Sequence, residues 1–205
     1  MKRNILITGK KGFIGRQIIG GKEFKGRLEN YKSLLNQTKD IIGIVHLAAV
    51  SNNRLCQMNP KKCINSNLIS LCNILEVALK RNIWVLFISS FQIKEMTLYG
   101  LSKLFGEELC RIYQQKGLKV RIIRLPIIYG PDDRQDKIVT KIIRELQFGI
   151  NPKITTNKKF HFIYVNDAAK TIENEVSIIE GKLGKKYSLH QLKDGIKECL
   201  REKKK

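Results

Sequence analysis

A tyrosine and a lysine four positions apart are the residues of this sequence best suited to proton transfer. Tyr99 and Lys103 stand at the start of a segment with helical spacing, and residues four apart share one face of a helix. An ammonium group beside the phenol would lower the tyrosine pKa from about 10 and allow proton exchange near neutral pH. In so lysine-rich a chain the spacing can also arise by chance, so its meaning depends on the neighbouring segments.

A glycine-rich turn follows the first apolar run of the chain. Residues 5–8 predict a short buried strand, and the sequence Gly-Lys-Lys-Gly-Phe-Ile-Gly of residues 9–15 comes directly after it, ahead of a helix-like pattern. Strand, glycine turn and helix form the context of a phosphate-binding fingerprint. Gly9 would allow the tight turn, Gly12 would let backbone amides approach a pyrophosphate, and Gly15 would let the helix pack against the sheet. We expect dinucleotide binding; the alternative is a turn with a purely structural role.

The rest of the chain alternates between apolar runs and helical patterns. Strands are predicted over residues 41–47, 84–88, 119–125 and 160–165, and helices over 62–81, 98–115, 138–148 and 189–200. This alternation predicts an α/β protein with a Rossmann-like, doubly wound parallel sheet. Ligands of such sheets bind beyond the carboxyl ends of the strands, where the glycine turn, residues 48–49, 89–90 and 126–131 all fall. We expect one Rossmann-type domain over residues 1–205, with residues 132–205 contributing a small substrate-side lobe.

The composition indicates a soluble, cytoplasmic globular protein. Of its 205 residues, 42% are hydrophobic, and neither the apolar run 41–50 nor the run 5–8 is long enough for a membrane span or a signal peptide. The five cysteines include no Cys-x-x-Cys pair, which argues against a disulfide framework and a zinc site. The net charge of +21 could indicate nucleic-acid binding, but the basic residues are scattered. We interpret the charge as a lysine-biased surface that attracts anionic small molecules.

Taken in order, the motifs resemble one known family. They are Thr8-Gly9-x-x-Gly12-Phe13-Ile14-Gly15, His46-Leu47-Ala48-Ala49, Asn67 with the run 73–78, Ser89-Ser90, Tyr99-Gly-x-Ser-Lys103, Arg124-Leu-Pro126 with Tyr129-Gly130-Pro131, and the segment 162–167. The chain is similar to extended short-chain dehydrogenase/reductases of the NAD-dependent epimerase/dehydratase branch, which act on nucleotide-linked sugars. Each motif is modest, but the ordered set covers most of the chain and makes chance spacing of the tyrosine and lysine a poor explanation.

The resemblance implies an activity and a set of site residues. It implies an NAD(P)-dependent epimerase, dehydratase or ketoreductase in which Ser90 bonds the reacting sugar oxygen, Tyr99 exchanges its proton, and Lys103 lowers the tyrosine pKa and grips the nicotinamide ribose. NAD or NADP would be bound by Gly9, Lys11, Gly12, Phe13, Ile14, Gly15, Leu47, Ala48, Ala49, Lys103 and Pro126, and the substrate by Ser90, Arg124 and Tyr129. Arg124 would meet a substrate phosphate or simply end a strand, and Asn67 would bridge a helix to the site or lie on its surface.

The resemblance also bears on partners. It permits a homodimer through the helices 62–81 and 98–115, and it implies a nucleotide-sugar substrate, no specific nucleic acid and no membrane.

The sequence departs from the family pattern in two places that matter for binding. About 25 residues separate Gly15 from residue 41, so the second strand and its helix are expected to be deleted, and the usual carboxylate for the adenosine ribose has no clear counterpart. Lys10, Lys11 and Arg16 could compensate through phosphate contacts, which would favour NADP. The stretch between Ser90 and Tyr99 and the region after Asp167 are also short. The alternative to an enzyme is therefore a catalytically impaired Rossmann-fold binding or regulatory protein.

Overall fold

A five-stranded parallel sheet organises the protein. The computed structural model describes residues 4–173, 186–188, 190–191, 193–194 and 196–197. The strands are β1 (Ile5–Thr8), β2 (Lys22–Glu23), β3 (Gly43–His46), β4 (Trp84–Ser90) and β5 (Val120–Leu125), arranged in the order β2-β1-β3-β4-β5. The register aligns the ends of β1 and β3, because Thr8 pairs with His46, whereas β4 continues beyond them to Ser90, since His46 pairs with Phe87. The predicted α/β class and parallel sheet are confirmed.

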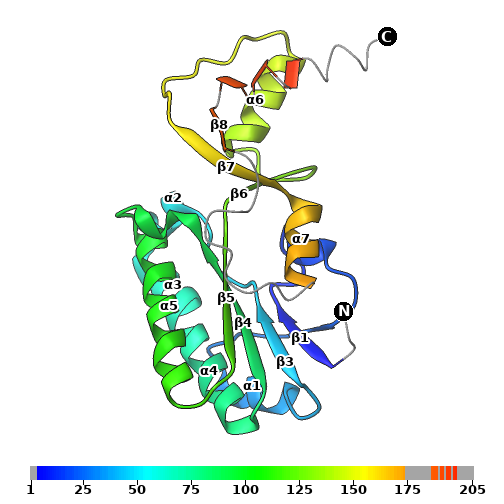
Figure 1. Cartoon of the computed structure of the whole chain (residues 1–205), viewed down its shortest axis with the longest axis vertical. Coiled ribbons are helices and arrows are strands. Elements are labelled where there is room, and N and C mark those ends of the chain that lie inside the picture. Colours follow the sequence, from blue (N-terminus) through cyan, green and yellow to red (C-terminus); the bar gives the residue numbers. More distant parts are fainter. Residues whose placement is uncertain (1–3, 174–185, 189, 192, 195, 198–205) are drawn as a thin grey trace.

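Two hydrophobic layers cover the two faces of this sheet (Figure 1). On one face pack α1 (Tyr31–Gln37), the helical run α3 (Pro60–Ile64), the π turn Asn65–Ile69 and α4 (Ser70–Arg81), and then α5 (Leu98–Gln115). On the other face lies α7 (Val165–Glu173), whose Ala169 and Ile172 pack with Ile18 against the apolar side chains of β1 and β4. Alternate strand residues therefore enter different layers, as the pleat of a strand requires.

A smaller lobe stands at the carboxyl edge of the sheet (Figure 1). It contains a second sheet in the order β6-β7-β8, made of β6 (Ile127–Tyr129), β7 (Lys159–Tyr164) and β8 (Lys186–Ser188), together with α6 (Ile138–Gln147). Val139, Ile142 and Phe162 form its buried centre. The predicted helix 138–148 and strand 160–165 are confirmed, whereas the predicted helix 189–200 lies partly outside the described residues.

The segment after the glycine turn differs from the prediction. Instead of an α-helix, the structure has a single 3₁₀ turn, Gly15–Gln17, and the chain then enters the two-residue strand β2 beside β1. Residues 16–41 hold no other strand, so the expected shortening of this region is confirmed. The turn ends at Ile18, whose backbone is extended, and Gly20 and Gly21 follow with positive φ values that a continuing helix does not contain.

The remaining elements are short. The helix α2 (Asn53–Met58) follows β3, and a 3₁₀ turn, Phe91–Lys94, links β4 to α5. Within the part of the chain that the structure describes, no helix has the length and apolar character needed to cross a membrane.

Candidate active site

A cavity of about 660 Å³ opens at the carboxyl edge of the sheet, between the sheet and the smaller lobe. It brings together most of the residues that the sequence predicted. These are Gly9, Gly12, Phe13, Ile14, Gly15, Leu47, Ala48, Ala49, Ser90, Tyr99, Lys103 and Pro126. Three predicted residues, Lys11, Arg124 and Tyr129, do not line it.

The glycine turn forms one wall of the cavity in a geometry that side chains would block. Gly9 has φ +71°, and a Cβ atom added to it would lie 2.8 Å from the amide nitrogen of Ala48. A Cβ on Gly15 would lie 2.3 Å from the Gly9 carbonyl oxygen. The Gly12 amide donates to that same carbonyl at 2.9 Å, which closes the turn. This cradle of main chain without Cβ atoms fits the close approach of a pyrophosphate.

A buried polar pair fixes the turn to the next strand. The Thr8 hydroxyl and His46 Nδ1 are hydrogen-bonded at 2.7 Å, and the Ala48 amide donates to the same hydroxyl at 3.3 Å. Burial, with the charge of Lys103, lowers the pKa of His46 to about 3. His46 is therefore a neutral structural residue at the strand end.

The first turn of α5 carries Tyr99 into the cavity. Thr97 caps the helix by accepting a hydrogen bond from the Gly100 amide at 3.1 Å. A Cβ on Gly100 would lie 2.3 Å from the Gln92 carbonyl oxygen, so only glycine lets the preceding 3₁₀ turn pack here. Tyr99 is 8% exposed, and the Ser90 side chain lies close enough to its hydroxyl to act on its pKa. Helix and strand end thus place the two side chains together, as the resemblance implied.

Burial raises the pKa of Tyr99 to about 12, although the hydrogen bond from Ser90 and the charge of Arg134 oppose this shift. The direction is opposite to the one expected from the Tyr99–Lys103 spacing. The reason is that the Lys103 ammonium group is directed at the main chain: its Nζ donates to the Ile88 carbonyl at 2.8 Å. At neutral pH the phenol is therefore protonated and can donate its proton.

Lys103 is itself an unusual cation. Its side chain lies 4.8 Å above the Phe87 ring and is only 4% exposed, and burial lowers its pKa to about 8. Lysine that is desolvated in this way changes protonation near physiological pH. Such perturbed groups in a cleft are typical of functional sites.

Asn67 joins three segments behind the tyrosine. It lies in the π turn, is 3% exposed, accepts from the Val50 amide at 2.8 Å and donates to the Ser102 hydroxyl at 2.9 Å. Ser102 in turn donates to the Tyr99 carbonyl at 2.8 Å. Of the two interpretations that the sequence left open, the structure supports the bridge. The π turn supplies it, because the extra residue rotates Asn67 toward α5.

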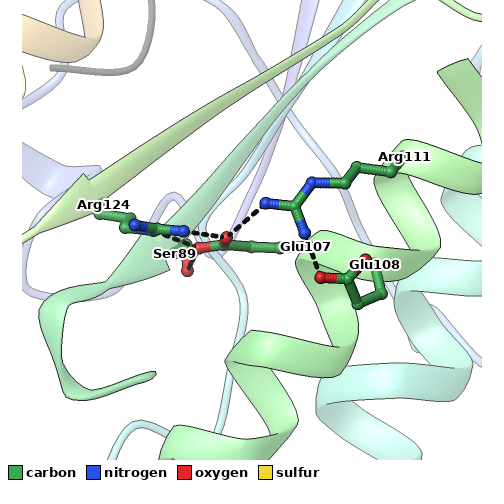
Figure 2. Close-up of polar contacts among 5 residues, drawn as sticks. All are labelled: Ser89, Glu107, Glu108, Arg111 and Arg124. Carbon is green, nitrogen blue, oxygen red and sulfur yellow. Dashed lines mark hydrogen bonds and ion pairs between the residues drawn. The ribbon is translucent and has the colours of Figure 1, made fainter. Parts of the chain in front are cut away.

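Arg124 belongs to a buried ionic cluster rather than to the cavity (Figure 2). Its guanidinium donates to both carboxylate oxygens of Glu107, at 2.9 and 2.8 Å, and the Ser89 hydroxyl donates to the same carboxylate at 2.6 Å. Burial alone would raise the pKa of Glu107, but the hydrogen bonds from Arg124 and Ser89 and the charge of Arg111 hold it below its usual range. Of the two interpretations that the sequence left open, these contacts support the structural one. The ionic cluster joins the ends of β4 and β5 to α5.

Tyr129 and the cations of the glycine turn also have structural contacts. Tyr129 packs edge-on against Phe162 and Tyr164 in the smaller lobe. Among the cations, Lys11 Nζ lies 3.5 Å from Glu23, Lys10 donates to the carbonyls of Ile18 and Gly20, and Arg16 donates to those of Pro131 and Asp132. Their engagement explains why Lys11 does not line the cavity, and it leaves phosphate binding by these three side chains without structural support.

Two residues near the cavity and the glycine turn were not predicted from the sequence. Arg134, from the loop after β6, lines the cavity and acts on the Tyr99 pKa, while its Nε lies 3.3 Å from Asp136. Glu23 ends β2, the strand beside β1, where a carboxylate for ribose hydroxyls was thought to be missing. An acidic residue at the end of a short polar strand could have pointed to Glu23 from the sequence. Arg134, in contrast, reaches the cavity only through the fold of its loop.

Replacing Glu107 by glutamine should destabilise the protein. The change keeps the volume but leaves the Arg124 guanidinium, 16% exposed, without its anionic partner, and breaking such a buried pair costs about 3–5 kcal/mol. We expect the free energy of unfolding at pH 7, measured by urea titration, to fall by about 3 kcal/mol.

The matched control is Glu108→Gln, because Glu108 is half-exposed and pairs with Arg111 at the surface. Stability from a carboxylate with a lowered pKa is lost as the pH falls through that pKa. The difference between the wild type and Glu107→Gln should therefore shrink below pH 4.5, the ordinary value for this group. A difference that stayed constant from pH 7 to pH 3 would contradict the assignment.

Lys103 should leave a signature in the pH dependence of stability. Between the folded pKa of about 8 and the ordinary value of 10.5, the unfolded chain holds a proton that the folded lysine has released. Stability rises with pH wherever the unfolded state binds more protons. The free energy of unfolding of the wild type should therefore rise relative to that of Lys103→Met between pH 8 and pH 10, as measured by urea titration. Parallel curves would show that the lysine is not desolvated.

Comparisons with known proteins agree with this geometry. The model of the NAD dependent epimerase/dehydratase family matches residues 22–173. A UDP-2-acetamido-2,6-beta-L-arabino-hexul-4-ose reductase from Pseudomonas aeruginosa is 29% identical over 90% of this chain and 52% of its own length. A putative UDP-glucose 4-epimerase from Methanocaldococcus jannaschii is 28% identical over 94% of this chain and 81% of its own. This chain thus spans about half of the length of the reductase.

Solved structures show the same fold at low identity. A UDP-N-acetylglucosamine 4-epimerase from Methanobrevibacter ruminantium, in complex with UDP-N-acetylmuramic acid, superposes with a TM-score of 0.86 at 22% identity, over 98% of this chain and 83% of that one. A UDP-glucose 4-epimerase from Thermus thermophilus, in complex with NAD, gives a TM-score of 0.79 at 18% identity, over 95% and 82%. The family model, which covers most of the chain, and the cavity at the carboxyl edge lead to one conclusion: the chain belongs to the NAD-dependent epimerase/dehydratase family.

Proposed function

We propose that the protein is an NAD(P)-dependent epimerase, dehydratase or ketoreductase of a nucleotide-linked sugar. The observation that carries the proposal is the meeting of Ser90, Tyr99 and Lys103 in one cavity with the glycine turn. Bound nicotinamide would supply the hydride acceptor and donor that side chains lack. The turn fits the pyrophosphate of such a cofactor, because Gly9, Gly12 and Gly15 leave its main chain open to close approach.

The side chains of the trio divide the proton chemistry among them. Tyr99, protonated at neutral pH, donates its proton to the oxygen of a sugar ketone that is being reduced, and it takes a proton back when a sugar hydroxyl is oxidised. The Ser90 hydroxyl, which lines the same cavity as the phenol, holds the same sugar oxygen in place. Lys103 lines the same cavity, and its ammonium group, which donates to the Ile88 carbonyl at 2.8 Å, would also bond the hydroxyl groups of the nicotinamide ribose.

The lining of the cavity supports a substrate that is both anionic and rich in hydroxyl groups. Arg54, Arg134, Lys137 and Lys159 line it along with Lys103, against the two acids Glu95 and Asp136. A nucleotide sugar carries a diphosphate, which such a wall attracts. In addition, two buried polar atoms, Asn53 Oδ1 and His161 Nδ1, belong to lining residues and have no hydrogen-bond partner within the described structure. Sugar hydroxyl groups would satisfy them.

A second candidate is a catalytically impaired binding protein of the same family. It is favoured by the 3₁₀ turn that replaces the first α-helix, because a full helix would add its dipole to phosphate binding. A thermal-shift titration with NAD, NADP and UDP-, GDP- and dTDP-hexoses separates the two candidates. A rise in melting temperature with a dinucleotide supports the enzyme. An unchanged melting temperature with both dinucleotides supports the impaired protein.

Replacing Tyr99 by phenylalanine should remove turnover and spare binding. General acid–base catalysis contributes about 10²–10⁴-fold, so we expect a loss of that size in conversion of the nucleotide hexose that stabilises the wild type. Dinucleotide binding by thermal shift should stay unchanged. The control is Tyr113→Phe, a change of the same kind in the same helix that leaves the cavity intact. A Tyr99→Phe variant with wild-type turnover would refute the mechanism.

We also propose a homodimer through the outer faces of the helical run 60–81 and α5. These helices expose apolar side chains, among them Ile64, Ile69, Phe105 and Ile112, and contiguous exposed apolar surface is typical of association sites. Phe105→Glu should convert a dimer into a monomer in light scattering, whereas Phe148→Glu, at the exposed residue just after α6, should not. A monomeric wild type would refute this proposal.

A cytoplasmic location also stays a prediction, with which the free cysteines Cys56, Cys63, Cys72 and Cys110 agree.

A further inference from the structure

A second cavity, of about 680 Å³, lies next to the candidate active site. The two cavities share Gly9, Ala48 and Ala49 in their walls, so they meet at the glycine turn. From there the second cavity runs between the loop after β2 and the start of the helical run that begins at Pro60. A ligand bound at the turn can therefore extend into both cavities.

The division of a dinucleotide between the cavities follows from the proposed function, on which this inference rests. Nicotinamide must lie beside Tyr99 and Lys103, which line only the first cavity. The pyrophosphate lies at the glycine turn, where the main chain is open. The adenosine half must then occupy the second cavity. Its lining residues consequently decide which adenosine ribose the protein accepts.

The second cavity has a cationic lining. Arg27 comes from the loop after β2, Lys61 and Lys62 come from the first turn of α3, and Glu29 is the acid among the lining residues. All three cations are exposed, and no ion pair engages their side chains within residues 4–173 and the other described positions. Three cations thus face this space against one carboxylate.

The backbone under these cations is held firmly. Asn59 accepts from the Lys62 amide at 3.0 Å, the Asn30 amide donates to the Arg27 carbonyl at 3.1 Å, and Asn73 donates to the Leu28 carbonyl at 2.9 Å. The two segments therefore form fixed walls on either side of the cavity. Side chains on fixed walls lose less entropy when they close on a ligand.

NAD and NADP differ only by a phosphate on the adenosine ribose. A carboxylate that bonds the ribose hydroxyls selects NAD, whereas nearby cations accommodate the phosphate of NADP. Glu23, the acid at the end of β2, is paired with Lys11 at 3.5 Å and does not line the second cavity. We propose that Arg27, Lys61 and Lys62 form a site for the 2′-phosphate of NADP, and that the protein prefers NADP over NAD.

Calorimetric titration of the full chain with NAD and with NADP tests the proposal by binding alone. We expect NADP to bind about 10-fold more tightly than NAD in 50 mM salt, the size reached when a few partly exposed charge contacts add together. The preference should weaken in 300 mM salt, because exposed charges are screened. Adenosine 2′,5′-bisphosphate should likewise bind more tightly than adenosine 5′-monophosphate.

Variants at the exposed cations identify the site. Arg27→Gln and Lys62→Gln should each reduce the preference for NADP at least threefold and leave the dissociation constant of NAD within about twofold. Lys80→Gln, the same charge change on an exposed residue of α4 outside the cavity, should leave the preference intact. Unchanged melting temperatures would show that the variants fold.

The outcomes separate this inference from the proposed function. Equal or tighter binding of NAD overturns the NADP site but leaves the proposed enzyme standing. A preference for NADP that survives Arg27→Gln and Lys62→Gln overturns the assignment of these residues. Failure of both dinucleotides to bind overturns the proposed function and the NADP site together.

Discussion

The main chain of Gly9 lies against the main chain of Ala48, and the rest of the site depends on this contact. An added Cβ would come within 2.8 Å of the Ala48 amide nitrogen, so the ends of β1 and β3 can meet only around a glycine. Thr8 and His46 join the same two strand ends through a buried hydrogen bond. Because both cavities share Gly9 and Ala48 in their walls, any loss of this contact would change both cavities.

Two buried polar groups hold the catalytic side of the cavity in the same manner. Glu107 joins α5 to the ends of β4 and β5 through Ser89 and Arg124 (Figure 2). Asn67 joins the π turn to α5 and to the loop after β3. Ser90 and Tyr99 thereby rest on elements that are tied to one another. Their mutual position is set by buried contacts, as the proposed catalysis requires.

The region after the glycine turn is shorter than a full dinucleotide-binding unit. A 3₁₀ turn stands where an α-helix was predicted, and α7 contributes Ala169 and Ile172 to the apolar layer that covers β1 on that face. A helix dipole at the pyrophosphate is therefore reduced to a single turn. In the proposed enzyme, amides of the glycine turn and cations around the two cavities would supply a larger share of the anion binding.

The sequence by itself determined the parallel sheet, because buried strands and amphipathic helices have different periods that can be read from apolar spacing. It also determined most of the candidate site, since Gly9, Ser90, Tyr99 and Lys103 follow strand ends or a helix start, and strand ends of a parallel sheet meet at one edge. Only the tertiary structure decided the role of Arg124, which pairs with a glutamate on another element, and the Tyr99 pKa, which burial raises to about 12. It alone also brought Arg134, Lys61 and Lys62 to the cavity walls. Burial and charge pairing depend on what distant segments place nearby, and no local pattern of residues contains that information.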